Sequence, residues 1–358
     1  MTPISSQSWN SRGEVSVLGT GAWFPEPLLD TETLLRHAGL SGRNRNLALT
    51  VAERLGIGTR HVARAWAART DMPLPGASNP DLAAGAVRAA LNEAGLGVAD
   101  LGYLIAHTAT PAQPLPSNVT LVADRLGYAG PHIELRQACT GFANALMIAF
   151  GLLRDPDARP VAIVGSETGS VFLDLDALEG QPGQIVNLVQ MGDGAGAIIL
   201  GPAGSGTERL RAAWYGAIGL DRSPGLQMRS GGSDRPGSGG PGPLIFEHDF
   251  GAVFRGGAEL FDAGVAAATA RGFDPAGVDW IIPHQASGKV GGQVAAHLGL
   301  PPARFFVNAD RVGNTGSAAI WIALDALRAQ KLPPGARTIA LGAEATKYMF
   351  GGFVHEIA

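Results

Sequence analysis

The sequence predicts an α/β protein built from two similar α/β halves, residues 1–205 and 206–358. Short apolar runs typical of buried strands alternate with longer segments of helical periodicity, which favours a parallel or mixed sheet covered by helices on both faces. The same alternation restarts in the second half, and a length of 358 residues suits about two domains of ordinary size. The 51 Gly and 24 Pro residues follow no period, so they indicate turns and exclude a collagen-like fibre.

The N-terminal half begins with an apolar strand at Val15–Leu18, which the glycines of Gly19-Thr20-Gly21 are expected to end in a turn. A helix over Asn79–Gly95 has the clearest limits, because Asn79 can cap it and the closing glycine suits a left-handed C-cap. Pro80 suits its first helical position. The other expected elements are a helical pattern in 51–67, strands at Leu101–His107, Ile133–Leu135, Val161–Gly165 and Gly194–Leu200, and helices containing Leu121–Leu126 and Phe142–Leu153.

The C-terminal half repeats this order after a long polar segment. Ser223–Pro243 has fifteen Gly, Pro or Ser among its 21 residues, which predicts a mobile excursion on the surface. The expected elements around it are strands at Leu210–Ala217, Trp280–Pro283 and Thr338–Leu341, and helices at Ala258–Ala270, Lys289–Leu298 and Ser317–Ala329.

Composition excludes several classes of function. The net charge is 27 − 31 = −4, so the chain has no basic field for nucleic acid. The single cysteine, Cys139, permits no intrachain disulfide and no thiolate metal site, and it indicates a reducing compartment. The most apolar stretch, Ala143–Leu153, has eleven residues, whereas a membrane span needs about 18. We therefore expect a cytoplasmic protein without a membrane span, and its low charged fraction of 16% suggests an oligomer interface.

Motifs for nucleotide or metal cofactors are absent from the sequence. The one GxGxxG pattern, Gly237–Gly242, has neither a strand before it nor a helix after it. There is no P-loop, HExxH or GxSxG motif. The glycines around Asp193 are interpreted as a tight strand start at which backbones approach closely, although Asp193 could bind a ligand.

Three polar side chains stand where α/β sheets assemble their sites. Cys139 lies between a strand ending near Leu135 and a helix beginning near Phe142, where the helix N-terminus favours a thiolate; a small buried hydrophobe is the alternative interpretation. His284 directly follows an expected strand, and Asn314 lies in a glycine-bounded turn before an expected helix. The three together are more specific than any one of them.

These segments resemble a known family. Ala138–Phe142, Pro283–Ala286 and Gly313–Thr315 are similar to the Cys, His and Asn motifs of the 3-oxoacyl-acyl-carrier-protein synthase III enzymes, in the thiolase superfamily. The match also takes in Gly19–Gly21 and Gly192–Ala197, so it spans nearly the whole chain. The resemblance implies a duplicated five-layer thiolase-like fold and a homodimer.

The resemblance also implies a reaction. Cys139 would accept the acyl group of an acyl-CoA or acyl-carrier-protein thioester. His284 and Asn314 would stabilise the enolate formed when a malonyl thioester loses carbon dioxide. No cofactor or metal is then needed. The lack of a second cysteine argues against a biosynthetic thiolase.

The C-terminal loop departs from the family pattern. The family's oxyanion glycine maps onto Thr346, which keeps a backbone N–H. Glu344 and Lys347 bring an acid and a base to the same loop. They are either an exposed or mutually paired couple, or they recognise a polar acceptor or an acyl group that bears a carboxylate.

The substrate contacts also depart from the pattern. Thr50 and Ile185 replace residues that hold adenine, which favours a donor carried on a protein. In the family, the helix that binds the acidic carrier protein usually presents several basic residues. Here that helix has Lys289, so its basic patch is smaller than the family's. Leu115 stands where a larger Phe is common, which suggests a deeper pocket for medium-chain or branched acyl groups.

Three functions follow in order of preference. The first is a decarboxylative condensing enzyme, in a specialised or secondary-metabolic pathway rather than in housekeeping fatty-acid initiation. The second is an acyltransferase that passes the acyl group from Cys139 to an alcohol or amine. The third is a non-catalytic partner subunit, which the presence of Cys139, His284 and Asn314 disfavours.

Overall fold

The structure is a computed structural model that describes residues 8–66, 72–178, 180–228 and 247–358. The Gly237–Gly242 pattern and residues 229–243 of the Gly/Pro/Ser-rich segment lie outside the described residues. Among the described residues, no helix combines the length and apolar character that a membrane crossing requires.

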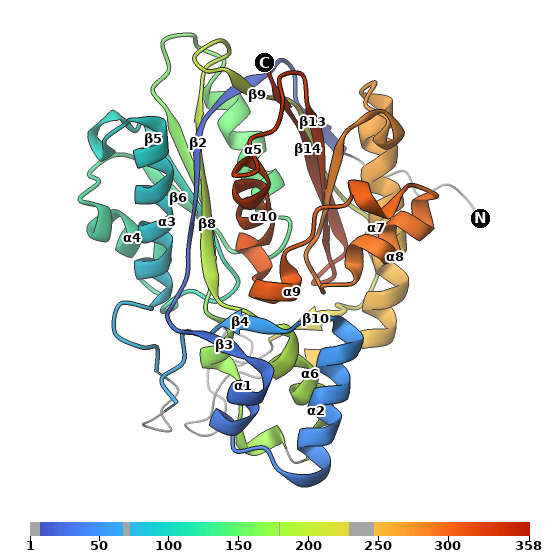
Figure 1. The fold of residues 1–358 in the computed structure, drawn as a ribbon. Helices are drawn as coiled ribbons and strands as arrows, with labels where there is room; N and C mark the ends of the chain where they lie inside the picture. Colours follow the sequence, from blue (N-terminus) through green and yellow to red (C-terminus); the bar gives the residue numbers. More distant parts are fainter. Residues whose placement is uncertain (1–7, 67–71, 179, 229–246) are drawn as a thin grey trace.

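Layers of helix and sheet alternate across the molecule, with two central helices between two groups of strands (Figure 1). The N-terminal half contributes β2 (Val15–Trp23), β5 (Tyr103–His107), β6 (His132–Leu135), β7 (Val161–Glu167) and β8 (Gly194–Gly201), with helices α3 (Asn79–Ala94), α4 (Asn118–Leu126) and α5 (Gly141–Leu152). The C-terminal half contributes β9 (Glu208–Ala217), β12 (Trp280–Pro283), β13 (Arg337–Glu344) and β14 (Met349–Ile357), with helices α7 (Phe250–Ala270), α8 (Val290–Leu298), α9 (Ala309–Val312) and α10 (Ala319–Arg328).

The two halves repeat one topology. In the first, the strand order is β6-β5-β7-β8-β2, with parallel pairs up to β7 and antiparallel pairs after it. In the second, the order is β12-β13-β14-β9 with the same directions, and a parallel bridge from Ile281 to Phe305 stands where the first half has β6. The predicted pair of similar α/β halves and the thiolase-like fold class are therefore confirmed.

The strand sets divide between β8 and β9, close to the predicted boundary at residue 205. β2 pairs with β9, so these nine strands form one continuous sheet, and β1 (Ser8–Asn10), which pairs with β9, is its tenth strand. The halves are thus joined by hydrogen bonds as well as by the chain, and their division into two domains stays a prediction.

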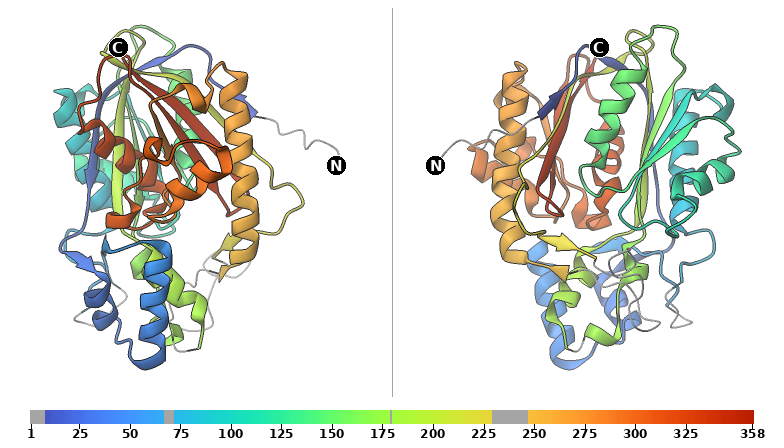
Figure 2. Two further views of the ribbon diagram at one scale, coloured as in Figure 1. Left: turned by 45° about the vertical axis from the view of Figure 1, so that its right-hand side comes forward. Right: turned by 180° about the vertical axis from the view of Figure 1, so that it is seen from behind.

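The central core lies between the two groups of strands. Phe142 of α5 packs edge-on against Trp321 of α10 and Phe353 of β14, and the last two rings stack 5.6 Å apart. Separate apolar clusters lie under the outer helices, with α3 and α4 covering one face and α7 and α8 the other (Figure 2). This arrangement gives the expected five layers. Each helix or strand that buries a face in one of these layers has an apolar run in its sequence.

A smaller cap lies below the layers in Figure 1. It comprises β3 (Leu28–Asp30), β4 (Thr59–His61), α1 (Thr31–His37), α2 (Gly42–Leu55) and α6 (Pro182–Gln190), around an apolar cluster of its own. The predicted helical pattern in 51–67 is wrong beyond residue 55, because Gly56 adopts φ 66° and ends α2.

Three further predictions about local structure are wrong. The glycines of Gly19-Thr20-Gly21 lie inside β2 and form no turn, because α3 packs so closely that a Cβ at Gly19 would lie 2.4 Å from the Ala90 carbonyl oxygen. The N-cap of α3 is Ser78, since Asn79 is buried in a polar network. Residues 342–344 and 349–352 of the C-terminal loop belong to strands β13 and β14, so the loop is only the turn at residues 345–348.

Candidate active site

Cys139 lies in the turn between β6 and α5, one residue before the N-cap Thr140, as the sequence predicts. Its side chain is partly exposed to two cavities. The larger, about 370 Å³, is also lined by His284 and Asn314. The smaller, about 80 Å³, runs between Cys139, Thr110 and Asn314. The three residues singled out from sequence therefore meet at one place.

The surroundings of Cys139 favour the protonated thiol in the free protein. Burial raises its pKa well above the ordinary value, and the nearby carboxylates of Glu344 and Glu167 raise the pKa further. Burial and the two carboxylates therefore oppose the thiolate that the sequence leads us to expect at this helix N-terminus.

His284 is held as a neutral imidazole. Its backbone N–H donates to the Leu341 carbonyl (2.8 Å), which extends the register of β12 against β13 by one residue. The side chain is buried, and burial lowers the pKa of His284 to about 4. Among the described residues its Nδ1 has no hydrogen-bond partner. A neutral ring in this position can donate one hydrogen bond into the cavity.

The amide of Asn314 is oriented by its own backbone. Its N–H donates to the Gln190 carbonyl (2.8 Å), and its carbonyl accepts from the Gly192 N–H (3.1 Å). The side-chain Oδ1 accepts from the Gly316 N–H (3.1 Å), which leaves Nδ2 as the group able to donate into the cavity. Asn314 therefore offers a donor of fixed direction and no charge.

Two buried carboxylates bind the ends of the central helices reciprocally. Glu167, the last residue of β7, accepts from the Ser317 N–H (3.3 Å) and hydroxyl at the 3₁₀ turn Gly316–Ala318 that leads into α10. Glu344, the last residue of β13, accepts from the Thr140 N–H (2.8 Å) and hydroxyl (2.7 Å) before α5. Each half thus holds the start of the other half's central helix.

This contact corrects the prediction for Glu344 and Lys347. Glu344 is only 2% exposed and bonds Thr140 and the Thr346 hydroxyl, so it lies behind Cys139. Lys347 is exposed, and its ammonium donates to the carbonyl of Arg222. They are neither an exposed couple nor a mutual pair, and neither is among the described residues lining the two cavities at Cys139. Substrate recognition by these side chains stays a prediction.

Thr346 lies in the turn between β13 and β14. Its hydroxyl donates to Glu344, and its neighbour Ala345 lines the larger cavity. A role for its backbone N–H in an oxyanion hole stays a prediction.

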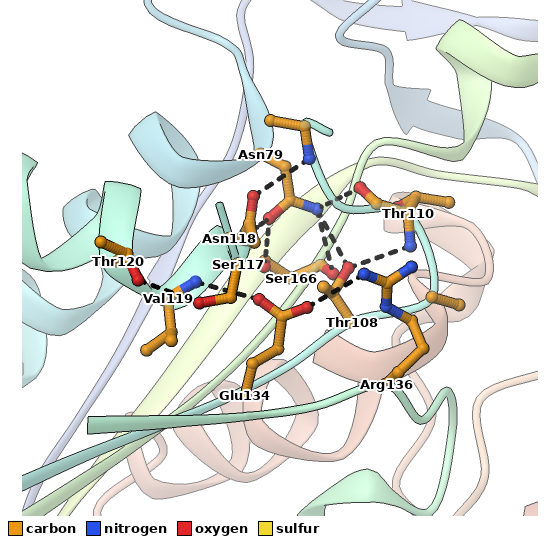
Figure 3. Close-up of polar contacts among 12 residues, drawn as sticks. Asn79, Thr108, Thr110, Ser117, Asn118, Val119, Thr120, Glu134, Arg136 and Ser166 are labelled. Carbon is orange, nitrogen blue, oxygen red and sulfur yellow. Dashed lines mark hydrogen bonds and ion pairs between the residues drawn. The ribbon is translucent and has the colours of Figure 1, made fainter. Parts of the chain in front are cut away.

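A polar network fixes the segment between β5 and α4 (Figure 3). Asn79 donates to the Thr108 hydroxyl (3.1 Å) and the Thr110 carbonyl (2.8 Å). Its Oδ1 accepts from Asn118 (2.8 Å) and from the Ser166 hydroxyl (2.6 Å). All five side chains are buried, so Thr110 is held firmly where it lines the smaller cavity.

Leu115 lies in the same segment but faces outward. It is 85% exposed and is not among the described residues that line either cavity at Cys139. Its contribution to the depth of an acyl pocket stays a prediction. An exposed Leu on a firmly held loop suits a contact between chains.

Lys289 is exposed at the N-cap of α8, beside Gly56 at the end of α2. At the other end of this helix, His297 lines the larger cavity and bonds Asp262 (2.7 Å). Ile185 is fully buried within α6 and cannot stack on a base. Carrier docking at Lys289 stays a prediction.

The glycine run around Asp193 has the structural role preferred from sequence. The buried carboxylate accepts from the Ala63 N–H (2.7 Å) and the Ser170 N–H (3.1 Å). At Gly192 a Cβ would lie 1.9 Å from the Val312 carbonyl oxygen, so only glycine fits. This close approach holds Gly192 against Asn314 in the site.

Sequence reasoning missed three residues that line both cavities: Gln190, Leu226 and His248. Leu226 pairs with His248 across the strands β10 (Leu226–Gln227) and β11 (Glu247–His248). Leu226 belongs to the Ser223–Pro243 segment, so the prediction of a surface excursion is wrong at this residue. The sequence signal for it was the pair of apolar residues Leu226 and Met228 near the start of an otherwise polar segment.

Comparison with known proteins places the chain in a family. The model of 3-oxoacyl-[acyl-carrier-protein] synthase III matches residues 133–217, and the model of its C-terminal part matches residues 268–354. The β-ketoacyl-[acyl-carrier-protein] synthase III of Rhodospirillum centenum is 32% identical over 314 residues, which are 86% of this chain and 88% of that protein. The chain belongs to the β-ketoacyl-acyl-carrier-protein synthase III family. The resemblance and the enzyme class inferred from Cys139, His284 and Asn314, an acyltransferase of this type, are confirmed.

Two solved structures share the fold over nearly the whole chain. A tetronic acid condensing enzyme has a TM-score of 0.83 and 29% identity, covering 96% of this chain and 99% of that one. The 3-oxoacyl-(acyl carrier protein) synthase III of Pseudomonas aeruginosa has a TM-score of 0.78 and 27% identity, covering 96% and 98%. Both similarities include the strands and central helices that carry the site.

Proposed function

We propose that the protein joins an acyl group held on Cys139 to a malonyl-type thioester, with loss of carbon dioxide. The observation that carries this proposal is the 370 Å³ cavity in which one thiol faces two uncharged hydrogen-bond donors, His284 and Asn314. A nucleophile with neutral donors suits acyl transfer followed by formation of an enolate. Membership of the synthase III family supports the same reaction.

The first step loads the enzyme. The sulfur of Cys139 forms a bond to the carbonyl carbon of an acyl thioester, the bond from that carbon to the donor's sulfur breaks, and the thiol proton of Cys139 ends on the departing thiol. The product is an acyl-cysteine beside His284 and Asn314.

The second step forms the carbon–carbon bond. Loss of carbon dioxide from the malonyl thioester leaves its electron pair as an enolate, whose oxygen accepts hydrogen bonds from His284 and Asn314. The enolate carbon attacks the acyl-cysteine, and the thiolate of Cys139 leaves. Carbon dioxide loss supplies the carbanion, so we propose that no cofactor or metal takes part.

The proposed substrates are acyl-CoA or acyl-carrier-protein thioesters and a malonyl thioester, with Lys289 in carrier docking. A homodimer is proposed because Leu115 is exposed on a fixed loop and because only 16% of residues are charged. A cytoplasmic location is proposed from the single cysteine. The similarity to a tetronic acid condensing enzyme supports a specialised pathway.

The test follows both steps in one preparation. Intact-protein mass spectrometry after incubation with a chain-length series of acyl thioesters should show one acyl mass on Cys139, and malonyl thioester should then release carbon dioxide. Acyl loading without carbon dioxide, together with transfer to an alcohol or amine, would replace condensation by acyl transfer. Absence of any acyl mass would indicate a partner subunit.

A further inference from the structure

Glu344 lies behind the nucleophile and is used by neither step of the reaction. One carboxylate oxygen accepts from the Thr140 N–H (2.8 Å) and hydroxyl (2.7 Å), and the other accepts from the Thr346 hydroxyl. The side chain is 2% exposed. It therefore joins the residue after Cys139 to the turn between β13 and β14.

In this position Glu344 occupies the Thr140 N–H, a hydrogen-bond donor that could otherwise stabilise a thiolate at Cys139. The free N–H groups at a helix N-terminus stabilise a negative charge beside them, which is how such a terminus lowers the pKa of a cysteine. Here the N–H of Thr140, the residue bonded to Cys139, is already bound to a carboxylate. The positive end of α5 faces Glu344 as well as the sulfur.

We propose that Glu344 is a positioning residue that holds the N-terminus of α5 and keeps Cys139 in the thiol form until a thioester occupies the cavity. This inference rests on the proposed function only in taking Cys139 to be the nucleophile. The argument from charge concerns the free protein and needs no substrate. By accepting from Thr346 as well, Glu344 also fixes the turn beside the acylation site.

The ionisable groups around the sulfur support this assignment. Glu344 from β13 and Glu167 from β7 both raise the pKa of Cys139, with Glu344 the larger of the two. His284 is neutral because burial lowers its pKa, and burial raises the pKa of Tyr215 on β9, so its phenol is uncharged. No Lys or Arg stands among the described residues that line the two cavities at Cys139. The remaining histidines of the lining are His248, whose pKa burial lowers to about 4, and His297, which bonds Asp262, so neither brings a free positive charge to the sulfur.

The test measures alkylation of the only thiol in the chain. Iodoacetamide modification of Cys139 is followed from pH 6 to pH 10 without substrate, for the wild-type protein and for Glu344→Gln, because the rate reports the thiolate fraction. Glutamine keeps an oxygen for Thr140 and a donor for Thr346 while it removes the charge. We expect Glu344→Gln to react about tenfold faster at neutral pH, with its profile moved to lower pH.

Two comparisons separate charge from structure. Glu167→Gln should move the profile in the same direction by less, and Glu259→Gln, an exposed carboxylate that bonds Arg222, should not move it. An unchanged profile in folded Glu344→Gln overturns the proposal. If that variant does not fold, the wild-type profile decides: a midpoint below the ordinary thiol value of about 8.5 overturns the proposal, and one above it supports it.

The proposed function is judged by a different readout. Acyl mass on wild-type Cys139 after incubation with a thioester tests the nucleophile, whereas the alkylation profile tests Glu344 in the absence of any substrate. Failure of the first with success of the second would leave Glu344 controlling a thiol that accepts no acyl group.

Discussion

The two halves have the same order of strands and helices but differ at the starts of their central helices. In the N-terminal half, α5 follows a thiol, Cys139. In the C-terminal half, α10 follows an amide, Asn314, whose donor is aimed into the cavity. The starts of two equivalent helices therefore meet at one site. In the proposed reaction, the N-terminal half carries the acyl group and the C-terminal half stabilises the enolate.

The strand ends differ in the same way. His107, the last residue of β5, is fully buried and accepts from the indole of Trp321 (3.2 Å). His284 follows the last residue of the equivalent strand β12 and lines the cavity. One histidine supports the core while its counterpart faces the cavity. The comparison teaches that a repeated backbone fixes where a site forms, while single side chains decide which half does which step.

The largest expected effect comes from the thiol of the N-terminal half. Cys139→Ala should abolish the acyl mass and all condensation, since no other thiol is present. Carbon dioxide release from malonyl thioester should persist, because His284 and Asn314 belong to the other half. Release measured in the variant at less than a tenth of the wild-type rate would contradict this division.

The converse change removes the donors of the C-terminal half. His284→Ala or Asn314→Ala should lower carbon dioxide release about 10²- to 10³-fold, the usual cost of removing one oxyanion donor. Loading of Cys139 should stay within about threefold of wild type by intact mass. Equal losses in both steps would show that the two halves do not act separately.

A third change weakens the contact between the halves away from the site. Arg328 on α10 bonds Glu208 on β9 (2.7 Å) and Glu93 on α3 (2.9 Å), and its side chain is 10% exposed. Arg328→Met removes both ion pairs and leaves His355 as the remaining partner of Glu208, so the free energy of unfolding in urea should fall by about 2 to 3 kcal/mol. Arg45→Met removes an exposed ion pair with Glu32 and should lower the free energy of unfolding by less than about 1 kcal/mol.

The smallest effect concerns acid stability and the structural histidine. Burial lowers the pKa of His107 to about 3, so the unfolded chain takes up the proton first and stability falls as pH drops below about 6.5. His107→Gln removes this titrating group. The free energy of unfolding of the variant should therefore fall by about 2 kcal/mol less between pH 7 and pH 5 than that of the wild type. Parallel pH profiles of the two proteins in urea unfolding would contradict the assignment.

Much of the site was predictable from sequence because its polar residues follow short apolar runs. Cys139, His284 and Asn314 each stand at a strand end or a helix start, and the sheet must bring such positions together. The thiol's protonation was not predictable, since Glu344 and Glu167 reach it from strands distant in sequence.

Other misses share one physical cause, namely tertiary contact that overrides a local pattern. Gly19 reads as a turn but lies in a strand because a helix backbone packs against it. Asn79 reads as a cap but turns inward to hold Thr110. Leu226 reads as part of a polar loop but lines the cavity. In each case the partner stands far along the chain.

The reciprocal carboxylates also bear on the ancestry of the molecule. A duplicated fold is equivalent to a dimer whose two subunits have been fused into one chain. In those terms, the bonds from Glu167 to Ser317 and from Glu344 to Thr140 are the intersubunit contacts of that dimer, made intramolecular by fusion. Separating the chain between β8 and β9 would leave each fragment with a buried carboxylate that has lost its helix.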